Sequence, residues 1–237
     1  MAFVMAGIIV AGFGLNLAMG RSSFARPLLV HAHAVVFMGW VVLYVLQNWF
    51  ATQGPMALHR RLGWVAIGWL GAMIYLGTAV TVALVQAGRA PFFFQPLHFL
   101  VFDPGTLLGA TGLILAGITV RRHTGWHRRL NYCGMSILIG PGFGRLLPMP
   151  FLIPWAYQLT FLCVLMLPII GIIADWRRDG RVHPAWWWGL GAIIADDLLI
   201  DLVTFSPLGL AIYQAVTAGT PGAAMAPLAF PPFPPLS

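Results

Sequence analysis

The sequence predicts an all-α, polytopic membrane protein with about seven transmembrane helices and a four-helix core made by helices 2–5. Of its 237 residues, 59% are hydrophobic and 8% are charged, and the mean hydropathy is +0.85. An average soluble domain is about 45–50% apolar and about 25% charged, and one soluble core of this size could not bury so much apolar surface. These values exclude a soluble enzyme.

Seven segments are long and apolar enough to be read as spans, because a membrane-crossing helix needs about 20 mainly apolar residues. The expected spans are 2–20, 27–51, 62–86, 96–120, 130–147, 151–174 and 186–216. The first has no basic residue before Arg21 and therefore lacks the start of a secretory signal peptide. Short connectors leave no room for a soluble domain, so residues 1–216 are predicted to form a single transmembrane domain.

Residues 217–237 are predicted to form a proline-rich tail, because they hold six prolines. Such a segment favours extended polyproline conformations and does not add a helix. We expect a flexible terminus outside the cytoplasm, with docking on a membrane-protein partner as the alternative.

The arginines predict the orientation of the chain, because cytoplasmic loops carry an excess of basic residues. Nine lie after expected spans 2, 4 and 6, and four lie after spans 1, 3 and 5. The N-terminus is therefore expected in the cytoplasm and the C-terminus outside, in a bacterial-type inner (plasma) membrane. The partner implied by the net charge of +7 is the lipid bilayer, with its anionic lipids; no basic soluble surface exists to bind nucleic acid.

An internal repeat suggests a duplicated helical hairpin. The segment Leu58-His59-Arg60-Arg61-Leu62 recurs 68 residues later as Trp126-His127-Arg128-Arg129-Leu130. The span before each copy begins Pro-Leu and carries histidine near its start, at His31 and His33 in one case and His98 in the other.

This repeat sorts the histidines into two layers. His59 and His127 are expected near the inner face, and His98 with His33 or His31 near the outer face. A six-coordinate haem b needs two facing imidazoles, so His33, His59, His98 and His127 are the candidate iron ligands. His31 and His33 are about 200° apart around a helix, so only one of them can face the bundle. Arg60 and Arg128 are candidate partners of the haem propionates. The alternative is that the His-Arg-Arg triplets only anchor the helices at the membrane surface.

The arrangement resembles the transmembrane di-haem b-type cytochromes of the ascorbate-reducible, ferrireductase-like family. The resemblance covers 27–147, about half the chain, and implies four central helices that hold two haems, each ligated by histidines of alternate helices. The chain departs from that family in having no lysine and no glutamate, and His98 lies closer to its proline than His31 and His33 do to theirs. The motifs also resemble a group of uncharacterised bacterial multi-pass membrane proteins, which implies no activity.

Charged residues within the expected spans are candidates for function, because they are costly in a bilayer. Asp197 and Asp201 share one helix face, and Arg145 is expected at a similar depth to Asp201. With Asp103 and an outer histidine they are predicted to form a polar pocket for a proton route or a quinol. The alternative is an Arg145–Asp ion pair that only joins two helices.

The sequence favours a membrane-embedded b-type cytochrome-like redox protein that carries electrons between a quinol or small reductant and an acceptor. One alternative is a non-redox accessory or assembly subunit of a larger membrane complex. The other is a proton-coupled transporter that uses Asp197 and Asp201.

Overall fold

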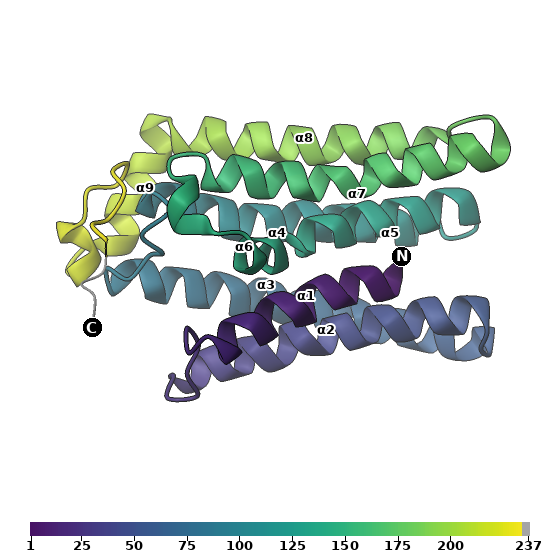
Figure 1. The fold of residues 1–237 in the computed structure, drawn as a ribbon, viewed down its shortest axis with the longest axis horizontal. Helices are drawn as coiled ribbons and strands as arrows, with labels where there is room; N and C mark the ends of the chain where they lie inside the picture. Colours follow the sequence, from purple (N-terminus) through teal and green to yellow (C-terminus); the bar gives the residue numbers. More distant parts are fainter. Residues whose placement is uncertain (234–237) are drawn as a thin grey trace.

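The computed structural model describes residues 1–233, and these residues form helices and connecting segments without any β-strand (Figure 1). The helices are α1 (Ala2–Ala18), α2 (Leu28–Thr52), α3 (Met56–Gln86), α4 (Pro96–Thr119), α5 (Thr124–Leu138), α6 (Gly140–Leu146), α7 (Ala156–Asp179), α8 (Pro184–Thr204) and α9 (Pro207–Thr217). Two short 3-10 helices follow α6 and α9, at Met149–Leu152 and Pro221–Ala224. The all-α prediction is thus confirmed for this part of the chain.

Four helices, α2, α3, α4 and α7, are long and apolar enough to cross a membrane. The membrane prediction is therefore supported, but seven spanning helices are not confirmed. Helix α1 has only 17 residues, and α8 carries three aspartates within 21 residues.

Two of the expected spans are each divided into two helices. Span 130–147 breaks at Ile139, just before Gly140-Pro141, and span 186–216 breaks at Phe205 and Ser206, just before Pro207. Proline lacks a backbone N–H and disfavours helical geometry in the residue before it. The apolar pattern continues through both breaks, which is why hydropathy predicts single spans there.

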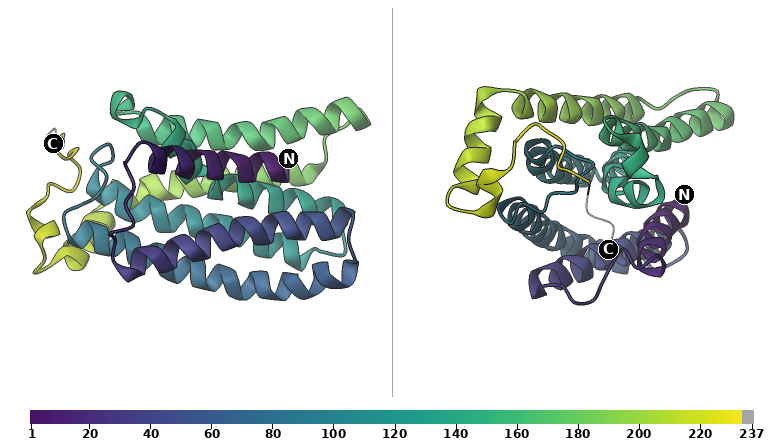
Figure 2. Two further views of the ribbon diagram at one scale, coloured as in Figure 1. Left: turned by 60° about the horizontal axis from the view of Figure 1, so that its bottom comes forward. Right: turned by 60° about the vertical axis from the view of Figure 1, so that its left-hand side comes forward.

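The long helices lie side by side along one axis, and α9 lies across the end of the bundle (Figures 1 and 2). The connections α2–α3, α4–α5 and α7–α8 lie at one end, here named the arginine-rich end because the nine arginines gather there; α9 and the C-terminus lie at the opposite end. Helix α4 is central and has α3, α5 and α8 as its main neighbours, against which its buried face packs.

The C-terminal segment 218–233 packs against the opposite end of the bundle instead of forming a free tail. The backbone N–H of Leu97 donates to the Pro227 carbonyl at 2.9 Å, and the Gln95 side chain donates to the Leu228 carbonyl at 2.6 Å. Leu97 is in the first turn of α4, where backbone N–H groups have no partner within the helix. The Pro227 carbonyl satisfies one of these donors, and the C-terminal segment thus covers the start of α4. Residues 234–237 of the expected tail lie outside the described residues.

Candidate functional site

His59 and His127 face each other near the arginine-rich end. Their ring centroids are 6.2 Å apart and their planes are inclined at 84°. Each is the fourth residue of its helix, because α3 begins at Met56 and α5 begins at Thr124. Both helices start six residues before the spans expected from hydropathy. The earlier start places the two repeated motifs on helices in the same register.

The Nδ1 atom of each ring is bonded to the main chain of the preceding helix. His127 Nδ1 lies 2.8 Å from the Gly117 carbonyl oxygen at the end of α4, and His59 Nδ1 lies 3.2 Å from the Gln47 carbonyl oxygen in α2. A carbonyl oxygen only accepts hydrogen bonds, so each Nδ1 carries the proton and donates it. In the tautomer that these bonds select, the lone pair is on Nε2, and neither Nε2 has a hydrogen-bond partner within residues 1–233.

Gly117 is required for the close approach of α4 and α5 at this point. A Cβ on Gly117 would clash with the side-chain amide of Asn131 and would lie 3.2 Å from the His127 carbonyl oxygen. Asn131 Nδ2 donates to that carbonyl at 2.7 Å and lies 3.2 Å from His127 Nδ1. The His127 ring is thus held by the end of α4 through the Gly117 carbonyl, whereas Asn131 bonds to the main chain of His127.

The arginines that follow the two histidines differ in their environment. Arg60, Arg61 and Arg128 are exposed, and none forms an ion pair with a carboxylate in the described part of the chain. Arg129 is buried, with 4% of its surface exposed. Each histidine is therefore followed directly by an arginine, Arg60 or Arg128, that has no carboxylate partner in residues 1–233.

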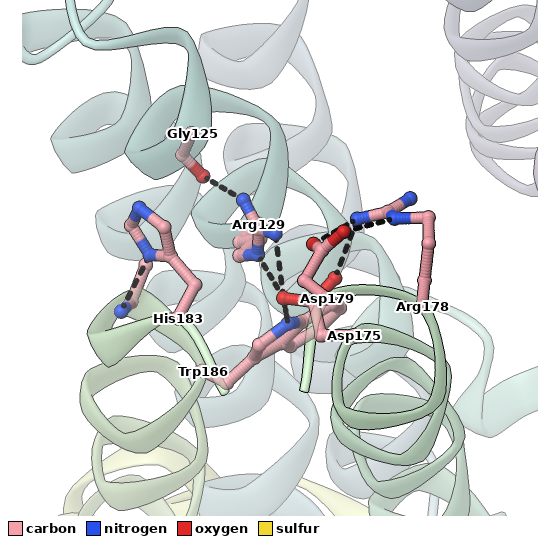
Figure 3. A network of polar contacts seen from close by, with 8 residues as sticks. Gly125, Arg129, Asp175, Arg178, Asp179, His183 and Trp186 are labelled. Atoms are coloured by element: carbon pink, nitrogen blue, oxygen red, sulfur yellow. Dashed lines mark hydrogen bonds and ion pairs between the residues drawn. The ribbon is translucent and has the colours of Figure 1, made fainter. Parts of the chain in front are cut away.

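Arg129 belongs to a polar network that joins α5, α7 and α8 (Figure 3). Its Nε donates to Asp175 Oδ2 at 2.7 Å, and Trp186 Nε1 donates to the same oxygen at 2.7 Å. Arg178 reaches the other oxygen, Oδ1, at 3.1 Å. Arg129 also donates to the Gly125 carbonyl at 3.0 Å. Asp175 thus receives three donors while it is buried, which satisfies the requirement that buried charges be paired.

The expected outer histidines do not come together. His31 bonds to the Phe24 carbonyl at 3.0 Å, and His33 stacks on Phe37 with 4.1 Å between the centroids. His98 instead faces α7 and α8: it contacts the Tyr157 ring at 4.5 Å, and its Nε2 lies 3.4 Å from Asp201 Oδ1. Within residues 1–233, only His59 and His127 have imidazole rings this close to each other.

Two of the four residues expected to share one polar pocket do meet an outer histidine. Asp201 lies 3.4 Å from His98 Nε2, and His98 packs on Tyr157, which donates a hydrogen bond to Asp197. Asp103 and Arg145 have other partners. Half-buried Asp103 accepts a hydrogen bond from Thr81 of α3, whereas Asp197 accepts one from Tyr157 of α7 at 2.7 Å. Arg145 donates to the Pro141 carbonyl at 2.9 Å, and its guanidinium group lies 3.9 Å from the ring centroid of Phe13 in α1.

The expected ion pair between Arg145 and Asp201 does not form. The helix break at Ile139 places Arg145 on the short helix α6, which packs on α1 rather than on α8. Asp201 has His98 as its neighbour instead.

Asp175, Asn131 and the carbonyls of Gln47 and Gly117 were not singled out by the sequence. Asp175 directly follows the apolar run of α7 and precedes Trp176-Arg177-Arg178. The sequence pattern therefore predicts that it belongs to a charged loop. Its position one residue beyond an expected span is the only signal that could have found it. The carbonyls carry no signal, because every residue has one.

Comparisons with family models, curated proteins and solved structures found no match to the chain. Within residues 1–233, no group of three or more His, Cys or Asp side chains is arranged to hold a metal ion. A six-coordinate haem takes only two protein ligands, so a pair such as His59 and His127 is the relevant arrangement for that cofactor.

Proposed function

We propose that the protein is a membrane-embedded b-type cytochrome in which His59 and His127 hold a haem b. The observation that carries this proposal is the 6.2 Å separation of the two imidazole centroids. A bond between a metal and an imidazole nitrogen is about 2 Å long. Two such bonds, plus the short distance from nitrogen to ring centre at each end, separate two axial imidazole rings by roughly 6 Å.

The hydrogen bonds of the two rings support the same arrangement. An imidazole that ligates iron through one nitrogen commonly donates its other N–H to a carbonyl or carboxylate, which fixes the orientation of the ring. His59 and His127 both donate through Nδ1 to a main-chain carbonyl, so Nε2 is the nitrogen available to iron.

The positive charges next to His59 and His127 match the negatively charged propionates of a haem. Arg60 and Arg128 directly follow the two ligands, are exposed and are free of carboxylate partners in residues 1–233. Guanidinium groups bind carboxylates bidentately, so these two arginines would hold the propionates. A bound haem supplies one-electron redox chemistry, and the protein would carry electrons between a quinol or small reductant and an acceptor.

The proposal is limited to the inner pair. The resemblance to di-haem cytochromes implies a second haem between the outer histidines, but His33 stacks on Phe37 whereas His98 packs on Tyr157. We therefore expect one haem per chain.

The test is the absorption spectrum of the purified full-length chain, produced in cells supplied with haem. We expect a Soret band, sharper α and β bands after dithionite reduction, and one haem per chain by pyridine extraction. His59→Ala and His127→Ala should each remove the haem, whereas His123→Ala, which changes an exposed histidine in a connecting segment, should retain it. A correctly folded chain without haem would overturn the proposal and would favour the non-redox subunit.

A further inference from the structure

A groove of about 500 Å³ lies between α4 and α8 and is here named the α4–α8 groove. Glycine and alanine leave this space open, at Gly109, Gly112, Ala116, Ala192 and Ala195. Trp126 and Trp188 line the groove near the starts of α5 and α8, at the arginine-rich end. Trp188 is 71% exposed and Leu199 is 57% exposed, so the groove opens on the outer surface of the bundle. Its volume is in the range of about 300–1,000 Å³ that small-molecule sites occupy.

Asp196 is the one charged side chain among the described residues that line the groove. It is half-buried, and its carboxylate lies against Gly109 of α4, where a Cβ would clash with it. The other two aspartates of α8 have neighbours, because Asp197 accepts a hydrogen bond from a tyrosine of α7 and Asp201 lies beside a histidine of α4. Within residues 1–233, Asp196 has no hydrogen-bond donor and no basic side chain as a partner.

We propose that the α4–α8 groove binds a lipophilic cation, with the positive charge beside Asp196 and the apolar body along the groove. A carboxylate at membrane depth is costly unless it is paired, and a cation supplies the missing partner. The faces of Trp126 and Trp188 attract a positive charge as well. An anion would require basic groups, and no arginine or histidine is among the described residues that line the groove.

The length of the groove favours a small molecule over the helix of a partner protein. The lining residues of α8 extend from Trp188 to Leu199, which is about 16 Å at a rise of about 1.5 Å per residue. A partner helix that crosses the membrane would need a contact face of up to about 30 Å. The site goes beyond the proposed redox function and does not depend on it, because neither His59 nor His127 lines the groove.

The test is equilibrium dialysis of tetraphenylphosphonium, a lipophilic cation, against the full-length chain in a non-ionic detergent, with empty micelles as the blank. Tetraphenylborate has the same shape and the opposite charge, and it is the matched control ligand. We expect saturable binding of the phosphonium and no saturable binding of the borate. Equal binding of both ions would overturn the proposal, because an apolar surface without charge selection would then explain the result.

Two pairs of variants locate the site. Asp196→Asn removes the charge and keeps the size of the side chain, so it should weaken phosphonium binding roughly tenfold; Asp197→Asn, outside the groove, should change the affinity far less. Gly112→Leu should block the groove, because a Cβ there meets no other atom within 4 Å and the side chain extends into the open space. Gly191→Leu is its control, because Gly191 of α8 is equally open but does not line the groove.

Unchanged affinity in Asp196→Asn, or equal effects of the two aspartate variants, would overturn the proposal. Gly112→Leu decides the question if Asp196→Asn does not fold, and unchanged affinity in this variant would also contradict the site. If the unchanged chain shows no saturable phosphonium binding, the proposal is wrong and a partner helix becomes the better candidate for the groove.

Discussion

Asp175 shows how much one side chain contributes to the arrangement of three helices. It lies at the end of α7, is 5% exposed, and accepts hydrogen bonds from Arg129 of α5 and Trp186 of α8. The neighbouring Asp179 is exposed and pairs only with Arg178. The two aspartates share a helix and differ mainly in burial, so they form a natural comparison.

We expect Asp175→Ala to lower the free energy of unfolding by about 3 kcal/mol, because it leaves the Arg129 guanidinium group buried without its carboxylate. Asp179→Ala should leave stability nearly unchanged, because exposed ion pairs contribute little. The measurement is thermal unfolding of both variants in the same detergent, followed by circular dichroism. Equal effects of the two substitutions would contradict a structural role for the network.

At the level of elements, the start of α8 and its packing on α7 depend on a few specific contacts. Gly171 of α7 lies directly against the Trp186 ring, where a Cβ would clash. His183 precedes α8, and its Nδ1 accepts a hydrogen bond from the Ala185 backbone N–H at 3.1 Å. A side chain that accepts from the first turn stabilises the start of a helix. Burial, and then the nearby guanidinium group of Arg129, lower the pKa of His183 below its ordinary value.

This lowered pKa predicts a pH dependence of stability. The unfolded chain takes up a proton on His183 at a higher pH than the folded chain does, so stability should fall as the pH drops from about 7 to about 5. The protonated ring also loses the acceptor for the Ala185 N–H. In His183→Asn, which keeps a capping oxygen but does not titrate, this part of the decline should disappear. The measurement is the midpoint temperature of thermal unfolding as a function of pH. If this midpoint falls equally steeply with decreasing pH in the unchanged chain and in His183→Asn, the prediction is wrong.

On the scale of the whole molecule, the chain reverses direction repeatedly, so its connecting segments alternate between the two ends (Figure 1). Nine of the 13 arginines lie in or close to the connecting segments at one end. The basic-residue excess of cytoplasmic loops therefore predicts that this end, with His59 and His127, faces the cytoplasm. The opposite end of the bundle, with α9, would then face the other side.

This orientation can be measured with single cysteines in exposed connecting segments. Ser22→Cys lies between α1 and α2 at the opposite end, and Gln53→Cys lies between α2 and α3 at the arginine-rich end. A membrane-impermeant maleimide should label the first in intact cells and the second only after permeabilisation. The unchanged chain, with Cys133 and Cys163, provides the background, and the reverse labelling pattern would refute the predicted orientation.

The sequence by itself determined the helical membrane character of the chain and the pairing of His59 with His127. Both depend on local or repeated patterns: hydropathy along the chain, and two His-Arg-Arg motifs that begin equivalent helices. The membrane character follows from the average hydropathy of the residues, which does not depend on how the helices pack. The two His-Arg-Arg motifs occupy the same position at the start of their helices, so their histidines can be paired without knowledge of the packing.

Only the tertiary structure decided which polar groups meet. In the structure, Arg145 of α6 packs against Phe13 of α1, and His98 lies beside Asp201. Asp175 accepts hydrogen bonds from Arg129, Arg178 and Trp186. The physical reason is that these contacts depend on where prolines interrupt the helices and on how closely glycines let helices approach. A break at Ile139 redirects a side chain six residues later, and hydropathy alone carries no information about that change of direction.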